Sequence, residues 1–275
     1  MTGALIAVIE REFKRLGRQR GRLLSTLARP LLWLVVIGSG FAAVMPDRAG
    51  LSYQQFLLPG IIGMVLLFST TLSALGTVHD REFGPMRMLL VAPVARSTLV
   101  LAKALAATLV GTAQAIVLLP LVALLGLAIT FESLPVALGA MLLTAFTLSS
   151  LGMLLASRIR SLENFAVVMN FVLFPMFFLS GSLYPASGLP AFLQPAVWIN
   201  PLTYGVDLLK HALHGPVIGH QFAGEFPVLV SVVVLSAYSV VAIAGAAALF
   251  GREEHLSRIL LSGAPQRQRA REPDR

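Results

Sequence analysis

Long apolar stretches alternate with short charged connectors along the chain, at lengths that suit membrane-spanning helices. We predict spans at about residues 30–45, 56–78, 98–129, 135–157, 164–184 and 227–250. About 20 apolar residues cross about 30 Å of hydrocarbon as a helix. The first span is too short alone, so we expect it to include residues 23–28 as well. The third span is longer than needed, so its first turns, including Lys103, should protrude into water or snorkel. The pattern predicts an all-α integral membrane protein with six transmembrane helices, in one transmembrane domain over residues 1–262.

The connector between the second and third spans, residues 79–103, is a charged segment between two long apolar stretches in the first half of the chain. Residues 56–78 before it and 104–129 after it carry no ionisable side chain. Inside the connector, Pro85 and Pro93 enclose an apolar-rich piece at residues 86–91, and prolines punctuate helices. We expect a short helix lying across the membrane surface, bracketed by turns, on which another protein can act.

Two further segments should lie at the membrane surface rather than cross it. Residues 3–22 have an amphipathic helical pattern typical of a helix on an anionic surface, and the alternative is an ordinary basic flank of the first span. Residues 185–215, between the fifth and sixth spans, are too polar and too rich in Pro and Gly to cross. Their apolar pieces at 189–199 and 206–213 predict helices that dip partly into the bilayer and return.

The distribution of basic residues sets the orientation. Of the 21 Lys and Arg residues, 19 fall in the N-terminal arm, the second and fourth connectors and the C-terminal tail, and two, Arg48 and Lys210, fall on the other side. This asymmetry predicts a multi-pass protein of the inner (plasma) membrane with both termini cytoplasmic. Residues 185–215 would then face outside, and the basic tail at 263–275 should be disordered in the cytosol.

Composition agrees with a membrane protein. The chain is 56% hydrophobic and 12% charged, whereas soluble domains carry roughly 25% charged residues. The net charge of +8 could suggest nucleic acid. Because the basic residues form blocks between apolar spans instead of one face, the charge reports topology, and we expect membrane lipid and no nucleic acid as a partner.

Catalytic and metal-binding patterns are missing from the sequence. There is no cysteine, and the five histidines at positions 79, 211, 214, 220 and 255 fall in predicted loops or tails. That leaves no intramembrane metal site and no histidine to activate Ser180 or Ser182. None of the three lysines follows a glycine, so there is no phosphate-binding Gly-Lys loop. If the chain drives transport against a gradient, another subunit must supply the energy.

Two motifs carry a resemblance to a known family. They are DREFGPMR at residues 80–87 with LVAPV at 90–94, and SGSLYP at 180–185 with LP at 189–190 and NPLTY at 200–204. With them, the chain resembles the type-2 ABC exporter permeases, the family of daunorubicin-resistance, nodulation-factor and polysaccharide or teichoic-acid exporters. The resemblance covers essentially the whole chain in span count and loop placement.

The resemblance implies roles for particular residues. The coupling helix that is seated in a groove of the ATPase would comprise Asp80, Arg81, Glu82, Gly84, Met86, Arg87, Leu89, Leu90 and Pro93. An interfacial helix with Arg11, Phe13 and Arg15 would touch the same subunit, and the outer re-entrant motif would comprise Ser180, Gly181, Tyr184, Pro185, Asn200, Pro201 and Tyr204. The implied assembly is a half-transporter: a homodimer of permeases with two copies of an ABC ATP-binding subunit. ATP and magnesium would be bound by that partner, so this chain needs no cofactor.

Several of these residues also admit plainer interpretations. Asp80, Glu82 and Arg87 could simply fill a cytosolic loop, although the apolar piece between the prolines favours a partner groove. Phe171, Phe174 and Phe178 recur on one helix face and, with Asn170, could line an apolar substrate path, or face lipid and neighbouring helices. Asp207 and Lys210, three residues apart, predict an exposed pair of little consequence.

Three functions remain open at this point. The first is the transmembrane permease subunit of an ATP-driven ABC exporter, moving a drug, lipid-linked molecule or glycolipid out of the cytoplasm or inner leaflet. The second is a non-transporting membrane anchor or assembly factor for a cytosolic ATPase. The third, a proton-driven carrier, is disfavoured because the predicted span interiors contain no Asp, Glu, His or Lys.

Overall fold

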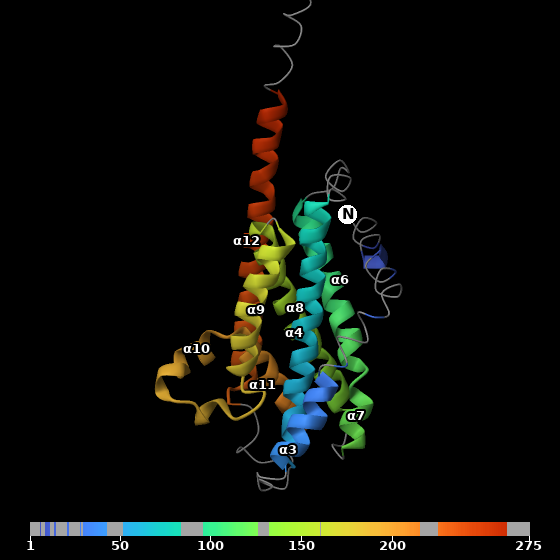
Figure 1. Ribbon diagram of the computed structural model, residues 1–275, viewed down its shortest axis with the longest axis vertical. Helices are drawn as coiled ribbons and strands as arrows, with labels where there is room; N and C mark the ends of the chain where they lie inside the picture. The colour runs from blue at the N-terminus through green and yellow to red at the C-terminus, as the bar shows by residue number, and fades with distance from the viewer. Residues whose placement is uncertain are drawn as a thin grey trace, which may run out of the picture.

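The structure is a bundle of helices along one long axis (Figure 1). It is a computed structural model, and it describes residues 30–42, 52–83, 96–125, 132–159, 161–214 and 225–262, with isolated positions between 6 and 28. For residues 251–262, and for Arg96 and Val122, only the backbone is described. Within these ranges all regular structure is helical, which agrees with the predicted all-α fold.

Four helices are long and apolar enough to cross a membrane. They are α4 (Tyr53–Glu82), α6 (Arg96–Ile116) continuing towards α7 (Leu119–Leu124), α8 (Ser133–Arg158) and α12 (Val228–Ser262). Two shorter apolar helices follow the first and fifth predicted spans: Pro30–Ala42, which includes η1 (Leu34–Gly38) and α3 (Ser39–Ala42), and α9 (Leu162–Phe178). The chain is therefore a multi-pass membrane protein, and the count of six spans stays a prediction.

The helices begin and end where the local sequence favours it. Ser52 caps α4, because its hydroxyl accepts from the Gln55 amide while the Gln55 side chain accepts from the Ser52 amide. The predicted third span is not continuous: α6 ends at Ile116 and α7 begins at Leu119. Pro120 lies in the first turn of α7, where its missing N–H costs nothing.

The centre of the bundle is α8, which packs against α4, α6, α11 (Pro201–His214) and α12. Small residues allow the close approach: a side chain at Gly152 of α8 would lie 3.0 Å from the methyl group of Ala74 on α4. Hydroxyl pairs add polar contacts between helices, with Thr108 and Ser149 3.0 Å apart and Thr147 and Ser239 2.9 Å apart.

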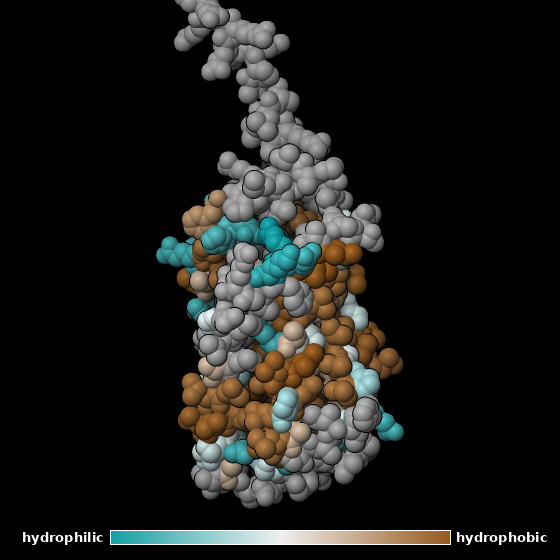
Figure 2. Space-filling view, turned by 90° about the vertical axis from the view of Figure 1, so that its right-hand side faces the viewer, coloured by the Kyte–Doolittle hydropathy of each residue, from teal (hydrophilic) through white to brown (hydrophobic). Residues whose placement is uncertain are grey.

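The surface shows where a membrane would lie. Figure 2 shows apolar residues gathered in a broad band over the middle and lower part of the face that α6 and α7 present, with hydrophilic residues concentrated above it. Exposed members on these elements include Leu109, Ile116, Val117 and Leu124. Such a band would aggregate in water, so the face is suited to lipid. We call the end of the bundle above the band, where α4 and α8 end, the charged end.

Candidate functional site at the charged end of the bundle

The last turn of α4 carries three consecutive charged residues, and the first of them is buried. At 30 residues, α4 is about 45 Å long, so its end lies beyond about 30 Å of hydrocarbon. The Asp80 carboxylate accepts from the Lys103 amine on α6 at 2.9 Å and from the Arg11 guanidinium at 2.8 Å. The side chains of Asp80 and Lys103 are 7% and 4% exposed. A charge buried to this degree needs a charged partner, so Asp80 joins α4, α6 and the N-terminal segment.

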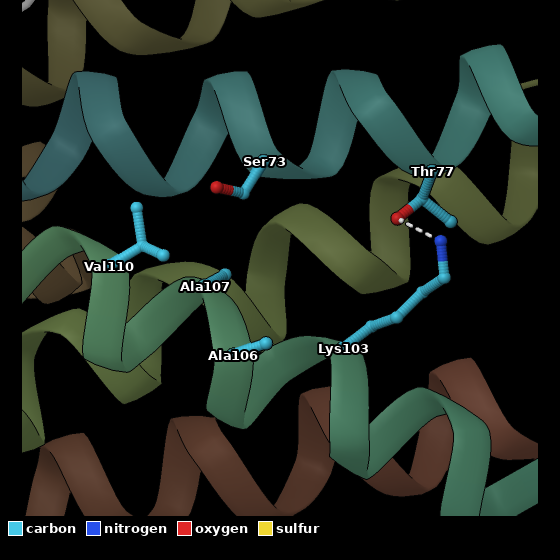
Figure 3. Close-up of a pocket in the computed structure, with 6 residues that line it drawn as sticks. All are labelled: Ser73, Thr77, Lys103, Ala106, Ala107 and Val110. Carbon is cyan, nitrogen blue, oxygen red and sulfur yellow. Dashed lines mark hydrogen bonds between the residues drawn. The ribbon is translucent and has the colours of Figure 1, made fainter. Parts of the chain in front are cut away.

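Lys103 departs from its sequence-based expectation. It was expected to protrude into water or snorkel, but it is buried because it reaches across from α6 to α4. Figure 3 shows its side chain extending to Thr77, whose hydroxyl lies 3.4 Å from the amine. A pocket of about 10 Å³ beside it, lined also by Ser73 and Val110, has roughly the volume that one water molecule needs.

Arg81 binds the end of α8. Its guanidinium donates to the carbonyl oxygens of Ala156 and Ser157, both at 3.0 Å. These carbonyls lie in the last turn of α8, where backbone acceptors lack intrahelical partners and a cation is favoured. The guanidinium also lies 5.1 Å from the ring centre of Phe250 on α12, a cation–π distance. Arg81 therefore contacts α8 and α12 together.

Glu82 binds the start of α9. Its carboxylate accepts from the backbone N–H of Leu162 at 2.8 Å, and the hydroxyl of Ser161 accepts from the Asn164 amide as the N-cap. The first turn of a helix leaves N–H groups without partners and favours negative charge. The three charged residues that end α4 thus contact the N-terminal segment, α6, α8, α9 and α12.

These contacts refine the predicted coupling region. Asp80, Arg81 and Glu82 are part of α4 and make contacts within their own chain, so any separate coupling helix begins after them. Gly84, Met86, Arg87, Leu89, Leu90 and Pro93 lie outside the described residues, as do Phe13 and Arg15 of the interfacial helix. Their contact with an ATPase stays a prediction.

The residues predicted for a substrate path share one face of α9. Asn170, Phe171, Phe174 and Phe178 are all exposed, and Phe171 is 84% exposed. The opposite face of α9 is buried, with Phe165 and Phe177 in the core. Pro175 lies in the last turn and the helix ends three residues later. The structure therefore brings the four residues together on one exposed face of α9, although the Phe174 ring also contacts Phe68 of α4 and the Phe178 ring contacts Trp33.

The predicted outer motif lies at the opposite end of the bundle, in the turn after α9 and in α11. Gly181 has a φ of 74°, which favours glycine, and the buried hydroxyls of Ser180 and Ser182 bond to each other. Past Pro185 come η2 (Ala186–Gly188), η3 (Ala191–Leu193) and α10 (Gln194–Ile199). Tyr184 donates to the Phe178 carbonyl at 2.7 Å.

Asn200 and Tyr204 anchor the start of α11. The Asn200 side chain accepts from Leu202 N–H at 3.0 Å and donates to the Met176 carbonyl of α9 at 2.7 Å. Pro201 is the first residue of the helix, and Tyr204 donates to the Trp198 carbonyl at 2.8 Å. The helix begins five residues earlier than the sequence indicated, because Asn200 caps it.

The expectation of an exposed Asp207–Lys210 pair was wrong. Both residues are buried in α11, at 3% and 5% exposure. Asp207 accepts from the Ser231 hydroxyl of α12 at 2.9 Å and from the Phe226 amide at 3.4 Å. Burial raises the pKa of the Asp207 carboxyl, and the Ser231 hydrogen bond and the nearby His211 oppose the rise. His214 is buried as well, so placing all histidines in loops or tails was also wrong.

Comparison with known proteins places this architecture in a family. A sequence profile described as ABC-2 type transporter matches residues 3–214. A protein named transport permease ycf38 of Cyanophora paradoxa is 31% identical over 212 residues, which cover 75% of this chain and 72% of that protein. Nodulation protein J of Rhizobium leguminosarum bv. trifolii is 30% identical over 203 residues, 71% of this chain and 76% of the relative. A multidrug ABC transporter permease, YbhR of Escherichia coli K12, is 30% identical over 168 residues, but these cover 58% of this chain and 44% of the relative.

Proposed function

The chain belongs to the ABC-2 type transporter family, and from this premise we propose that it is the membrane subunit of an ATP-driven exporter. It moves a hydrophobic or amphipathic molecule, such as a drug, a lipid-linked molecule or a glycolipid, out of the cytoplasm or inner leaflet. A separate ABC subunit binds ATP and magnesium. Membership of a family of transport permeases supports a transport role; substrate, direction and partner are proposals.

The observation that carries the proposal is the set of contacts made by the last turn of α4. The segment at residues 84–95, which we propose the ATPase binds, begins two residues after Glu82, the last of the three consecutive charged residues. These three side chains contact four other helices and Arg11. If the ATPase displaces the segment that follows α4, these charged contacts can therefore transmit the displacement to the other helices of the bundle. A membrane anchor has no need of such connections.

We further propose that the exposed face of α9 meets a second copy of the chain. Asn170 lies exposed among Phe171 and Phe174 in the middle of an apolar helix. A polar side chain facing lipid at this depth is costly, whereas small polar residues commonly bond across helices between subunits. The functional unit is then a homodimer, with two ATP-binding subunits and with the substrate passing along the aromatic face between the copies.

Arg87→Glu tests the coupling role. We expect an ABC ATP-binding subunit to co-purify with the wild-type chain. In the variant, transport-coupled ATP turnover should fall by at least about tenfold, because charge reversal at a docking surface costs several kcal/mol. Arg269→Glu, with the same charge change in the C-terminal tail, should behave as wild type. Both variants should insert into the membrane. Unchanged turnover in Arg87→Glu would refute the coupling role, and a partner whose turnover never responds to any substrate would favour the anchor.

Cysteine cross-linking tests the homodimer. The chain contains no cysteine, so Phe171→Cys introduces a single thiol on the exposed α9 face. Mild oxidation of membranes should convert most of this variant into a disulfide-linked dimer. Val240→Cys places an equally isolated thiol on α12 at 68% exposure and should stay monomeric. Equal cross-linking of both variants, or of neither, would contradict a dimer through α9.

A further inference from the structure

Helix α11 holds a cluster of buried ionisable side chains that the proposed coupling site does not use. The helix is not among the candidate membrane-spanning helices, yet every one of its residues except the half-buried His211 is buried. The cluster comprises Asp207, Lys210, His211 and His214, and Tyr204 is a further titratable residue of the helix. The helix is packed tightly against its neighbours. A Cβ atom added at Gly63 of α4 would lie 2.9 Å from the Val206 side chain, and one added at Gly205 of α11 would lie 2.4 Å from the Thr144 side chain.

Lys210 lies where three segments meet. Its ammonium is 5.1 Å from the ring centre of Phe56 on α4, and a Cβ at Gly181 would lie 3.5 Å from it. Burial lowers the pKa of the Lys210 amine, and the charges of Glu225 and Asp207 oppose the fall. Glu225, just before α12, accepts from the backbone N–H groups of Ala186 and Ser187. Lys210 thus lies beside α4, the turn after α9 and the segment before α12.

The turn at residues 180–184 is closed against α4. Ser182 is fully buried, and its carbonyl oxygen lies so near α4 that a Cβ at Gly60 would be 2.4 Å from it. The hydroxyl of Tyr53 on α4 donates to the Leu183 carbonyl at 3.0 Å. These contacts leave no room between the turn and α4, so an opening between them within the subunit requires the 180–184 turn to move away from α4.

His214 lies one helical turn beyond Lys210 and contacts α4. It is 4% exposed, and its Nε2 is 3.2 Å from the Gln55 carbonyl oxygen, to which it can donate. Within the described residues its buried Nδ1 has no hydrogen-bond partner. A second proton, on Nδ1, would put an uncompensated charge in a buried site beside the Lys210 ammonium, which costs free energy.

We infer that Lys210 and His214 hold the 180–184 turn closed against α4, and that protonation of His214 releases it. The pH-dependent opening does not depend on the proposed function; only its assignment to substrate release does. Among the described residues, the charged groups around α11 are Asp207, Lys210 and His211 on the helix itself, with Glu225 before α12. Two phenols also lie here, Tyr204 of α11 and Tyr238 of α12. The other contacts that the described neighbouring helices make with α11 come from groups that do not titrate: Gln55 and Phe56 of α4, Thr144 of α8 and Ser231 of α12.

The direction of the pH effect follows from the burial of His214. Burial and the charge of Lys210 lower the pKa of His214 in the closed arrangement, against the pull of the Gln55 hydrogen bond. An opened turn would return the imidazole to its ordinary pKa of about 6.5. Closure is therefore fully stable above about pH 6.5 and weakens as the pH falls below it. Lys210, whose pKa is also lowered, acts in the same direction, while the raised pKa of Asp207 opposes it.

Thiol labelling of the purified chain tests the inference without partner or substrate. Ser182→Cys places a single thiol in the closed turn, and Gly188→Cys places one at an exposed position with open space around it. A charged thiol reagent should label Ser182→Cys slowly at about pH 7.5. At about pH 5.5, one unit below the ordinary histidine pKa, its rate relative to Gly188→Cys should rise about fivefold to tenfold. The Gly188→Cys reference removes the pH dependence of the thiol reaction itself.

Two further variants identify the responsible residues. His214→Gln keeps a donor for the Gln55 carbonyl and should abolish the pH-dependent rise, whereas Lys210→Met should speed labelling at both pH values. A relative rate that does not change with pH, or a rise that persists in His214→Gln, would overturn the inference. Ser180→Cys, also buried, serves as a second reporter if Ser182→Cys does not fold. Because labelling needs no ATP, failure here leaves the coupling proposal intact.

Discussion

Replacing Asp80 with asparagine is expected to lower the free energy of unfolding by about 3 kcal/mol, the cost of removing one partner from a buried ion pair. The Asp80 carboxylate accepts from both Lys103 and Arg11, and the side chain of Lys103 is even more buried than that of Asp80. An asparagine has the same shape but leaves the buried ammonium without its countercharge. The purified chain in detergent should melt roughly 6–10 °C lower.

A matched control and a second-site change make the Asp80 result interpretable. Glu10→Gln removes one partner of the exposed Glu10–Lys14 pair and should leave the melting temperature unchanged, because exposed pairs are screened by solvent. Adding Lys103→Met to Asp80→Asn should recover most of the loss, since replacing both partners of a buried pair by neutral groups is often nearly neutral. If Asp80→Asn melts like Glu10→Gln, the pair does not hold α4 to α6.

The second large effect is expected at Gly60, where α4 meets the 180–184 turn. A methyl group there would lie 2.4 Å from the Ser182 carbonyl oxygen and 2.7 Å from the Ser182 Cα. Both are backbone atoms, so the turn itself must move. We expect Gly60→Ala to cost about 2–3 kcal/mol from overpacking, although alanine favours helix over glycine by about 1 kcal/mol. In the Ser182→Cys background it should also speed thiol labelling at neutral pH.

Gly139 provides the comparison for Gly60. It lies in α8 with nothing within 4 Å of an added Cβ, so Gly139→Ala should raise stability by up to about 1 kcal/mol through helix propensity alone. Opposite signs for the two Gly→Ala changes, read from thermal unfolding, are the expected result. A gain in stability from Gly60→Ala would mean that the turn does not pack against α4 as closely as described.

The long helices could be predicted from hydropathy because each carries a membrane length free of ionisable residues. Residues 56–78 and 135–157 correspond to α4 and α8, whose charged residues lie at the ends. The break between α6 and α7 had a local signal in Pro120 that a continuous apolar stretch concealed. Hydropathy sums over a window, so it detects length well and interruptions poorly.

The polar contacts could not be predicted, because they depend on packing between residues distant in sequence. Asp80 and Lys103 are 23 residues apart, and nothing in the linear sequence indicates that α4 and α6 bring them together. Helix α11 was predicted as a shorter re-entrant helix at residues 206–213, and the burial of its charged residues Asp207 and Lys210 was not predicted. Its burial depends on glycines at positions 63 and 205, whose partners only the fold reveals.

Helix α12 does not stop where the apolar stretch ends. The candidate span finishes at Phe250, but the helix continues to Ser262, and Figure 1 shows it projecting past the rest of the bundle. Twelve further residues of helix make a rod about 18 Å long. An affinity tag or fluorescent protein fused to the C-terminus would thus begin well clear of the membrane plane, which makes this terminus the suitable one for labelling the intact subunit.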